Sequence, residues 1–441
     1  MQGNNTETKS WLKNLFSDYR SSLNGSKDHA IHSYRKSGFE ALEGMEFPTR
    51  RDEDWKYFNV TKVMSTNYQI ATPVNSDINV SQFDIHELDA YKAVFVNGYF
   101  VDNLSSLPKN LDKVEVHALS AAMENQEYAD WIHQMIENKG GTEQNTFLHL
   151  NRAFSNEGMF IKISKNGSLD KPLHIMHVNT QDGEAHFSHP QMFLHAEQSS
   201  SATIIESYHS LNVADEYFTN SSNYVQVDAN ADVHHYRLQM ESGAANHINN
   251  TIVTQNRDSV YSSYAIDLGG AMVRNNISTE LLDSNTNTHY YGVYLGNDNQ
   301  QIDNQTFIDH AVPHCESNEI YKGILKDRAR GVFNGKVLVR RDAQKTNAFQ
   351  QNSSLVLSKN AIMDAKPQLE IYADDVKCSH GATIGQLDES SVFYLKSRGI
   401  SENEARKLLQ KAFLFEVLEN FQLDSVRDLA YQKIENKCDN G

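Results

Sequence analysis

Three stretches from the middle of the chain decide the fold: VYSSYAIDLG at Val260–Gly269, THYYGVYLG at Thr288–Gly296 and GVFNGKVLVR at Gly331–Arg340. Each is a short run rich in β-branched and aromatic residues, which favour strands. Clusters of Asn, Asp, Gly and Ser separate such runs, and the pattern continues from about Gly158 to Gly385. The middle of the chain is therefore predicted to consist of many short strands without intervening helices.

A strand-rich region of more than 200 residues must bury its strand faces in a barrel, a large sandwich or a stacked solenoid. Asn and Asp at the turns favour a β-helix, because they tolerate left-handed backbone conformations and hydrogen-bond to neighbouring backbone. The lack of a clean short repeat weakens the solenoid without excluding it. All three architectures stay open on this argument.

The regions before and after the strands have helical patterns. Apolar residues recur at helical spacing within Trp11–Leu42, which predicts two short helices, and again within Ala118–Ile136. Glu46–Val60 breaks this period and is predicted to be an extended connector. Ala93–Val96 is predicted to be a strand. The N-terminal region is therefore expected to be rich in helix with some strand.

Helical spacing returns after Ser390. Ser401–Glu404 matches the S-x-x-E capping box, so a helix is predicted to begin there and to end near Asn420. A second helix is predicted after Asp424. We expect a mainly β protein with an α-rich region at 1–144, a β core at 145–388 and a C-terminal helical region at 389–441.

Composition excludes several functional classes. The 441 residues include 40 Lys plus Arg against 57 Asp plus Glu, giving a net charge of −17, which disfavours binding to nucleic acid or anionic membranes. The polar N-terminus and the lack of long apolar runs predict a cytoplasmic protein. Cys315, Cys378 and Cys438 fit free thiols in a reducing compartment, and they are too few to hold an iron–sulfur cluster by four thiolates.

Catalytic motifs are missing from the sequence. Gly331–Val337 is similar to a phosphate-binding loop, but it is one residue too short between its glycines and lacks the Ser or Thr hydroxyl that would hold magnesium. A turn between strands is the simpler interpretation. No nucleophile-elbow, zinc-protease or dinucleotide motif occurs. We expect no enzyme activity from this chain, and any ATP hydrolysis must come from another protein.

The histidines of the β region form three close pairs: His174 with His177, His186 with His189, and His234 with His235. Because strand side chains alternate between faces, the members of each pair point apart, which favours solvated or hydrogen-bonded histidines over metal ligands. The group His310, His314 and Cys315 has better ligand chemistry. Pro313 within that group nevertheless indicates a structural turn.

Cys378-Ser379-His380 is a sharper candidate site. Residues i and i+2 of a strand share a face, roughly 6.6 Å apart, so the thiol and the imidazole can face one surface. Both groups are competent ligands for iron or zinc. The alternative is a buried structural cysteine beside a hydrogen-bonded histidine.

Three segments resemble one known family. The first, KPQLEIYADDVKCSHGATIGQLDESSVFYLKSRGISENEARKLL at Lys366–Leu409, closely resembles the SufB/SufD family of iron–sulfur cluster assembly proteins. Asn145–Pro172, which contains NRAFSNEGMFIKISKNGSLDKP, resembles the start of that family's β core. PTRRDEDWKYFNV at Pro48–Val60 is similar to the N-terminal region of the family's SufD branch. The resemblance implies a right-handed parallel β-helix flanked by helical regions.

The resemblance also implies partners and a site. It implies a scaffold subunit that works with a SufB-like subunit and a SufC-like ATPase, with no firmly bound cofactor. Cys378 and His380 would lie at the interface with SufB, where transient iron or a nascent cluster is shared. The C-terminal helices would contact the ATPase, and we expect the contact residues there to be Leu408, Leu409, Ala412 and Phe415. Unpaired strand edges predict a homodimer when the chain is isolated.

The alternative function is a β-helical carbohydrate-active enzyme. Such an enzyme would be expected to present clustered carboxylates in a groove. Asp374 and Asp375 are adjacent, so on a strand they would face opposite ways. Convergence of carboxylates in a groove, or exposure of Cys378 and His380 on a strand edge, distinguishes the two functions.

Overall fold

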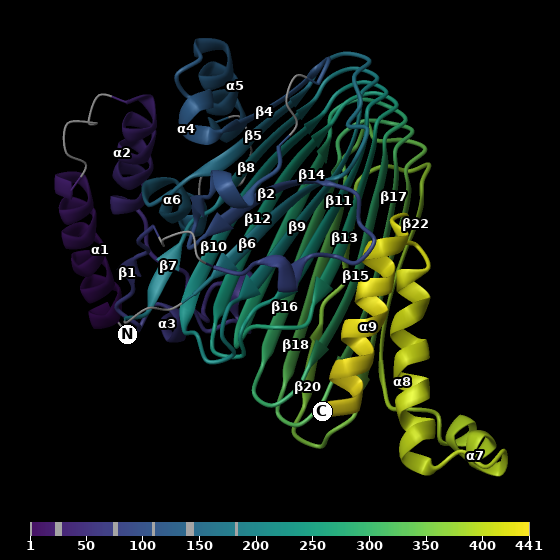
Figure 1. Ribbon diagram of the computed structural model, residues 1–441. Helices are drawn as coiled ribbons and strands as arrows, with labels where there is room; N and C mark the ends of the chain where they lie inside the picture. The colour runs from purple at the N-terminus through teal and green to yellow at the C-terminus, as the bar shows by residue number, and fades with distance from the viewer. Residues whose placement is uncertain are drawn as a thin grey trace.

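The computed structural model describes residues 2–22, 29–73, 78–107, 111–137, 145–180 and 184–440. Its centre is a parallel β-solenoid of about eight turns, with helices before and after it in the chain (Figure 1). This confirms the predicted β-helix with α-rich N-terminal and α-helical C-terminal regions. The barrel and the sandwich are excluded, because consecutive strands alternate between two open sheets and pair in parallel with the strands of the neighbouring turns, which makes a coil.

Most strands of the solenoid pair with the strand two positions away in sequence. Among the described residues, the larger sheet has twelve strands: β1 (Gln69–Ile70), β4 (Val114–Ala118), β5 (Gly158–Ile163), β7 (His186–Ser188), β8 (Gln191–Ala196), β10 (Tyr217–Val227), β12 (Asn246–Gln255), β14 (Met272–Leu281), β16 (Gln301–His310), β18 (Arg330–Val339), β20 (Ile362–Ala365) and β21 (Gln368–Ile371). The described part of the smaller sheet has ten: β2 (Tyr91–Val96), β3 (Tyr99–Phe100), β6 (Leu173–Asn179), β9 (Ser201–Ser210), β11 (Asp232–Met240), β13 (Val260–Asp267), β15 (Asn287–Gly296), β17 (Glu316–Leu325), β19 (Asn347–Val356) and β22 (Lys377–Gly385). The parallel ladders run without a shift along most strands, so ladder partners point to the same face.

The turns between strands use the residues that the sequence pattern indicated. Asn230, Asp258, Asn285, Asp298 and Asp327 all adopt positive φ angles between 52° and 63°. Asn and Asp tolerate this left-handed region better than other non-glycine residues. The expected role of these residues in a β-helix is therefore confirmed.

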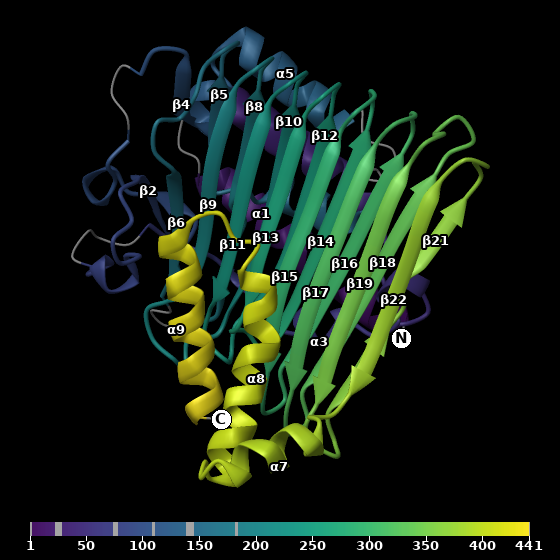
Figure 2. The ribbon, with the colours of Figure 1, turned by 90° about the vertical axis from the view of Figure 1, so that its right-hand side faces the viewer.

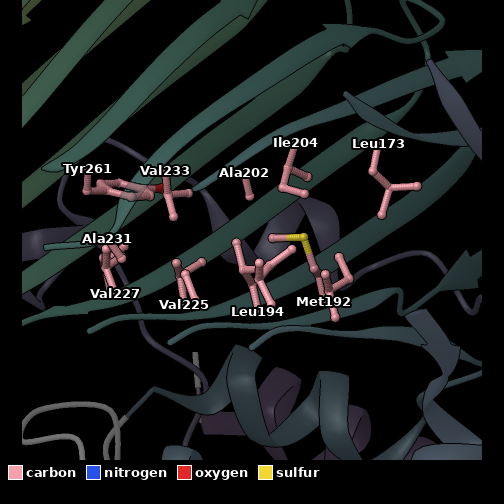
Figure 3. Packing of buried hydrophobic residues seen from close by; sticks show 14 of the residues in the cluster. Leu173, Met192, Leu194, Ala202, Ile204, Val225, Val227, Ala231, Val233 and Tyr261 are labelled. Atoms are coloured by element: carbon pink, nitrogen blue, oxygen red, sulfur yellow. The ribbon is translucent and has the colours of Figure 1, made fainter. Parts of the chain in front are cut away.

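The core lies between the two sheets. Near its N-terminal end this interior is apolar, and Figure 3 shows Met192, Leu194 and Val225 of one sheet facing Ile204 and Val233 of the other. These side chains are fully buried, which gives the solenoid its main hydrophobic stabilisation.

Along the same strands, two residues beyond Ile204 and Val233, the interior becomes polar. Glu206 accepts a 2.7 Å hydrogen bond from His235, and Arg237 forms a 2.8 Å ion pair with Asp267, all fully buried. Buried charges are tolerated when they are paired and hydrogen-bonded in this way. The inward rows therefore combine apolar packing with polar ladders.

Helices and the connector cover the larger sheet at the N-terminal side. The N-terminal elements are α1 (Gln2–Ser22), α2 (Ala30–Glu43), η2 (Glu53–Trp55), α3 (Val60–Val63), η3 (Ser81–Phe83), η4 (Asp102–Leu104), α4 (Leu119–Ala122), α5 (Gln126–Glu137) and α6 (Thr146–Ala153). The two helices predicted within 11–42 and the strand at 93–96 are confirmed. The single helix expected over 118–136 is broken in two, because Asn125 caps α5 by accepting a 3.0 Å hydrogen bond from the Glu127 amide.

The connector is not simply extended, since it contains η2 and begins α3. Its Trp55 ring lies under the Arg274 guanidinium, with 3.7 Å from the guanidinium carbon to the ring centroid. Arg274 also forms a 2.8 Å ion pair with Asp303 on the neighbouring strand. The connector is thereby fixed across the outside of the larger sheet.

Three helices follow the last strand: α7 (Glu389–Ser397), α8 (Glu402–Leu418) and α9 (Asp424–Asn440). The predicted cap is confirmed, because the Ser401 hydroxyl accepts a 3.3 Å hydrogen bond from the Glu404 amide. Helices α8 and α9 lie on the outer face of the smaller sheet (Figures 1 and 2), whereas α7 packs against α8 near the lower ends of the strands in Figure 2. None of the described helices combines the length and apolar character needed to cross a bilayer.

Candidate functional site

The candidate site lies on β22, the last strand of the smaller sheet. On one side β22 pairs in parallel with β19, and on the other side no strand of the described chain pairs with it. Figure 2 shows β22 at the edge of the sheet, with β21 of the larger sheet close by. Both sheets thus end in edges with unpaired backbone donors and acceptors, which suit the addition of another chain.

Cys378 and His380 share the inward face of this strand. Their ladder partners on β19 are Ala348 and Gln350, both of which are buried inside the solenoid. Cys378 packs beside the apolar cluster that contains Ala348, whereas His380 is exposed because no further turn covers it. The predicted shared face is therefore observed, and it is the inner face of an uncovered last turn.

The thiol and the imidazole differ in their surroundings. Partial burial raises the pKa of the Cys378 thiol, and a hydrogen bond with the Ala348 backbone offsets part of that effect. The thiol of the free chain is therefore protonated at neutral pH, and a bound metal would be needed to stabilise the thiolate. Among the described residues, no three His, Cys, Asp or Glu side chains gather into a group that could hold a metal ion. Cys378 and His380 alone are therefore fewer than the three protein ligands of such a group.

Apolar side chains surround the uncovered turn. Ile371 ends β21, Tyr372 follows it, and Ile384 lies on β22; all three are exposed. Exposed apolar groups on one turn are typical of a surface that binds another protein. This surface, defined by these three residues, is called the end surface below.

The histidines of the first two pairs are buried in the core, and His174 and His189 also have hydrogen-bond partners. His174 lies 2.7 Å from the Ser207 hydroxyl, while His177 stacks on Tyr208. Burial lowers the pKa of each of these two histidines to about 4, so both are neutral at physiological pH. His186 and His189 are also buried, with pKa values lowered to about 4 and 3 by burial. The hydrogen-bonded alternative is favoured over metal binding at these pairs.

The other candidates from the sequence are also structural. His314 adopts a φ of 63° in the predicted turn, and Cys315 is buried in the core. Gly331–Val337 lies inside β18, so the prediction of a turn there is wrong. Asp374 and Asp375 are exposed, and Asp375 pairs with Lys345. Neither aspartate belongs to a carboxylate cluster of the kind that a glycosidase uses.

The residues predicted to contact an ATPase lie on α8 in two environments. Leu408 and Ala412 are exposed, one helical turn apart, whereas Leu409 is half-buried and the Phe415 ring packs at a tilt against Tyr431 of α9. The opposite face of α8 buries Leu414, Val417 and Leu418 against the smaller sheet. This helix therefore has one face for the solenoid and an apolar stripe that remains uncovered.

Helix α7 lies in the C-terminal region that was predicted to be helical, but the sequence patterns did not define it as a separate helix. Its Phe393 is 73% exposed and Tyr394 is also exposed, which makes it part of the uncovered apolar surface. The available signal was Asp388, which accepts hydrogen bonds from the amides of Ser390 and Ser391 as an N-cap.

Comparison with known proteins gives the family. Residues 177–413 match the model described as SUF system FeS cluster assembly, SufBD core domain, and residues 6–175 match the SufBD protein N-terminal region. The chain belongs to the SufBD family. The resemblance noted in the sequence is confirmed, and a role in iron–sulfur cluster assembly follows from membership of this family.

Similar proteins cover nearly the whole chain. An iron–sulfur cluster assembly SufBD family protein of Synechocystis is 32% identical over 415 residues, covering 92% of this chain and 90% of the relative. The SufD protein of Escherichia coli is 31% identical over 398 residues, covering 89% and 90%. The SufD protein of Bacillus subtilis is 30% identical over 340 residues, covering 76% of both.

Proposed function

We propose that this chain is a non-enzymatic scaffold subunit that assembles iron–sulfur clusters together with a SufB-like subunit and a SufC-like ATPase. The observation that carries the proposal is that Cys378 and His380 share one face of β22, an edge strand that is paired on one side only. The similarity to SufD proteins supports the choice of partners. Three free cysteines support a reducing compartment, which we take to be the cytoplasm.

The SufB-like partner occupies the end surface. A second solenoid can continue both sheets by pairing with β22 and with β20 and β21, which would satisfy the backbone groups of these edges. The exposed apolar side chains of the end surface would become buried at the same time. Docking of one partner would thus remove both the unpaired backbone groups of the strand edges and the exposed apolar side chains of the end surface.

The same docking completes a ligand set. Cys378 and His380 supply one sulfur and one nitrogen donor from this chain, and the partner supplies the rest. Thiolate and imidazole suit iron and iron–sulfur clusters. The nascent cluster is cargo, held between the chains and then passed on.

The ATPase contacts the C-terminal helices. Leu408, Leu409, Ala412 and Phe415 mark this surface on α8, and Phe393 on α7 extends it. An uncovered apolar stripe on a helix is the kind of feature that a groove on another protein binds. ATP hydrolysis in the partner can then move the two scaffold chains through these helices.

Purification of the complex tests the proposal. The wild-type chain and the variant His380→Ala are each expressed with both partners, and His235→Ala serves as a matched control because His235 lies inside the solenoid. We expect His380→Ala to form the complete complex on gel filtration but to carry less iron and sulfide. Equal cluster content in wild type and His380→Ala, or an equal loss in both variants, would contradict the proposal.

A further inference from the structure

His380 is the last member of an inward row of polar side chains. In the parallel ladders, His380 on β22 pairs with Gln350 on β19, which pairs with Glu319 on β17. Strands are about 4.8 Å apart, so Gln350 lies directly behind His380 and Glu319 about 10 Å behind it. These three side chains point into the same inner column.

Gln350 and Glu319 are buried but incompletely bonded. Gln350 is 3% exposed and Glu319 is fully buried. Glu319 accepts a 2.6 Å hydrogen bond from the Thr306 hydroxyl through Oε2. Within the described residues, Oε1 of Glu319 and both polar atoms of the Gln350 amide have no hydrogen-bond partner of good geometry, although the Gln350 amide lies close enough to Glu319 to lower the pKa of its carboxyl. Buried polar groups are normally bonded, so this concentration of unused capacity behind His380 calls for a partner.

The opposite sheet makes room for the Gln350 amide. A Cβ atom added at Gly335 on β18 would overlap with Nε2 of Gln350. Strand β20 ends opposite Phe333 and β21 begins opposite Lys336, so Gly335 lies where the last strand of the larger sheet is interrupted. The amide is therefore held across the inside of the solenoid at its uncovered end.

We propose that Gln350 is a positioning residue for His380, holding the imidazole through one ring nitrogen so that the other can bind iron. This inference rests on the proposed function of His380 as a ligand. A ligating histidine usually uses its second ring nitrogen for a hydrogen bond that fixes the ring orientation. The Gln350 carboxamide offers both a donor and an acceptor at the right ladder position, and Glu319 supports the amide from the next strand.

Cobalt binding to the full three-protein complex tests this proposal, with Co²⁺ as a spectroscopic probe for iron. Gln350→Met keeps the volume of the side chain and removes its hydrogen bonds. Gln351→Met is the matched control, because Gln351 is the next residue of the same strand and points outward. We expect Gln350→Met to weaken Co²⁺ binding about tenfold or more while the thiolate-to-cobalt absorption is kept. Gln351→Met should bind as the wild type does.

The outcomes separate the positioning role from the proposed function. If His380→Ala binds Co²⁺ normally, the ligand role of His380 is wrong. If His380→Ala loses binding but Gln350→Met retains full affinity, only the positioning role is overturned. If Gln350→Met does not assemble, Gly335→Ala decides, because it displaces the amide without removing it. Normal Co²⁺ affinity in Gly335→Ala would then overturn the proposal.

Discussion

Helix α8 allows a direct test of the ATPase surface, because its two faces have different partners. Leu408 is 45% exposed, and Leu414 on the other face is fully buried against the smaller sheet. Full burial of a leucine side chain stabilises by about 1.5–3 kcal/mol. Covering the exposed part of Leu408 is therefore worth about 1 kcal/mol, so Leu408→Ala should weaken ATPase binding roughly fivefold.

The control is Leu414→Ala, which should lower the free energy of unfolding by about 2–5 kcal/mol because it leaves a cavity under the helix. Leu408→Ala should leave that free energy within about 0.5 kcal/mol of wild type. Titration calorimetry with the purified ATPase measures Kd, and urea unfolding measures stability. The assignment of this surface is refuted if both Leu408→Ala and the harsher Leu408→Asp bind the ATPase within twofold of wild type.

Three further predictions concern the solenoid itself. Burial raises the pKa of the Glu319 carboxyl from 4.5 to about 7. Between these two pH values the folded chain binds more protons than the unfolded chain, so the free energy of unfolding falls as the pH rises. Glu319→Gln should remove this pH dependence in urea unfolding and raise the free energy of unfolding by up to about 3 kcal/mol at pH 8. A Cβ at Gly323 would overlap the Tyr294 ring, so Gly323→Ala should lower stability by about 1–3 kcal/mol in the same assay, and an unchanged urea midpoint would contradict this packing. The isolated chain should dimerise through the edge of β22, and Ile384→Lys should shift sedimentation toward monomer; a wild-type chain that stays monomeric at high micromolar concentration would reject this interface.

The sequence was sufficient to predict those helices, strands and turns whose local residue pattern agrees with their packing in the folded protein. Turn residues such as Asn230 and Asp258 mark the solenoid corners because their backbone preference is local. The Ser401 cap likewise depends only on residues within one helical turn. Helix α7 has a good cap but buries only Val392, so it has no apolar stripe from which a periodicity could be recognised.

The site could be predicted only in part. The i, i+2 spacing of Cys378 and His380 is enough to place both on one face, because alternation is a property of any strand. This spacing does not show which face of the strand points inward, because β22 is exposed along nearly its whole length and lacks an alternation of apolar and polar residues. That assignment needs the ladder with β19. Gln350 was not predicted at all, because its ladder partners Glu319 and His380 lie about thirty residues away in the sequence and are of other residue types.

Two buried glutamates inside the solenoid, in neighbouring inner columns, show why the uncovered end differs from the rest of the solenoid. Glu206 accepts hydrogen bonds from His235, Tyr208 and Asn223, and its pKa is lowered despite complete burial. Glu319 is equally buried but has one strong donor, and its pKa is raised. The difference is therefore the number of partners rather than the depth of burial. A carboxyl left short of partners lowers stability, and such groups are enriched at functional sites. Glu319 lies two strands from His380. The carboxyl with fewer hydrogen-bond partners is therefore the one closer to the proposed cluster interface.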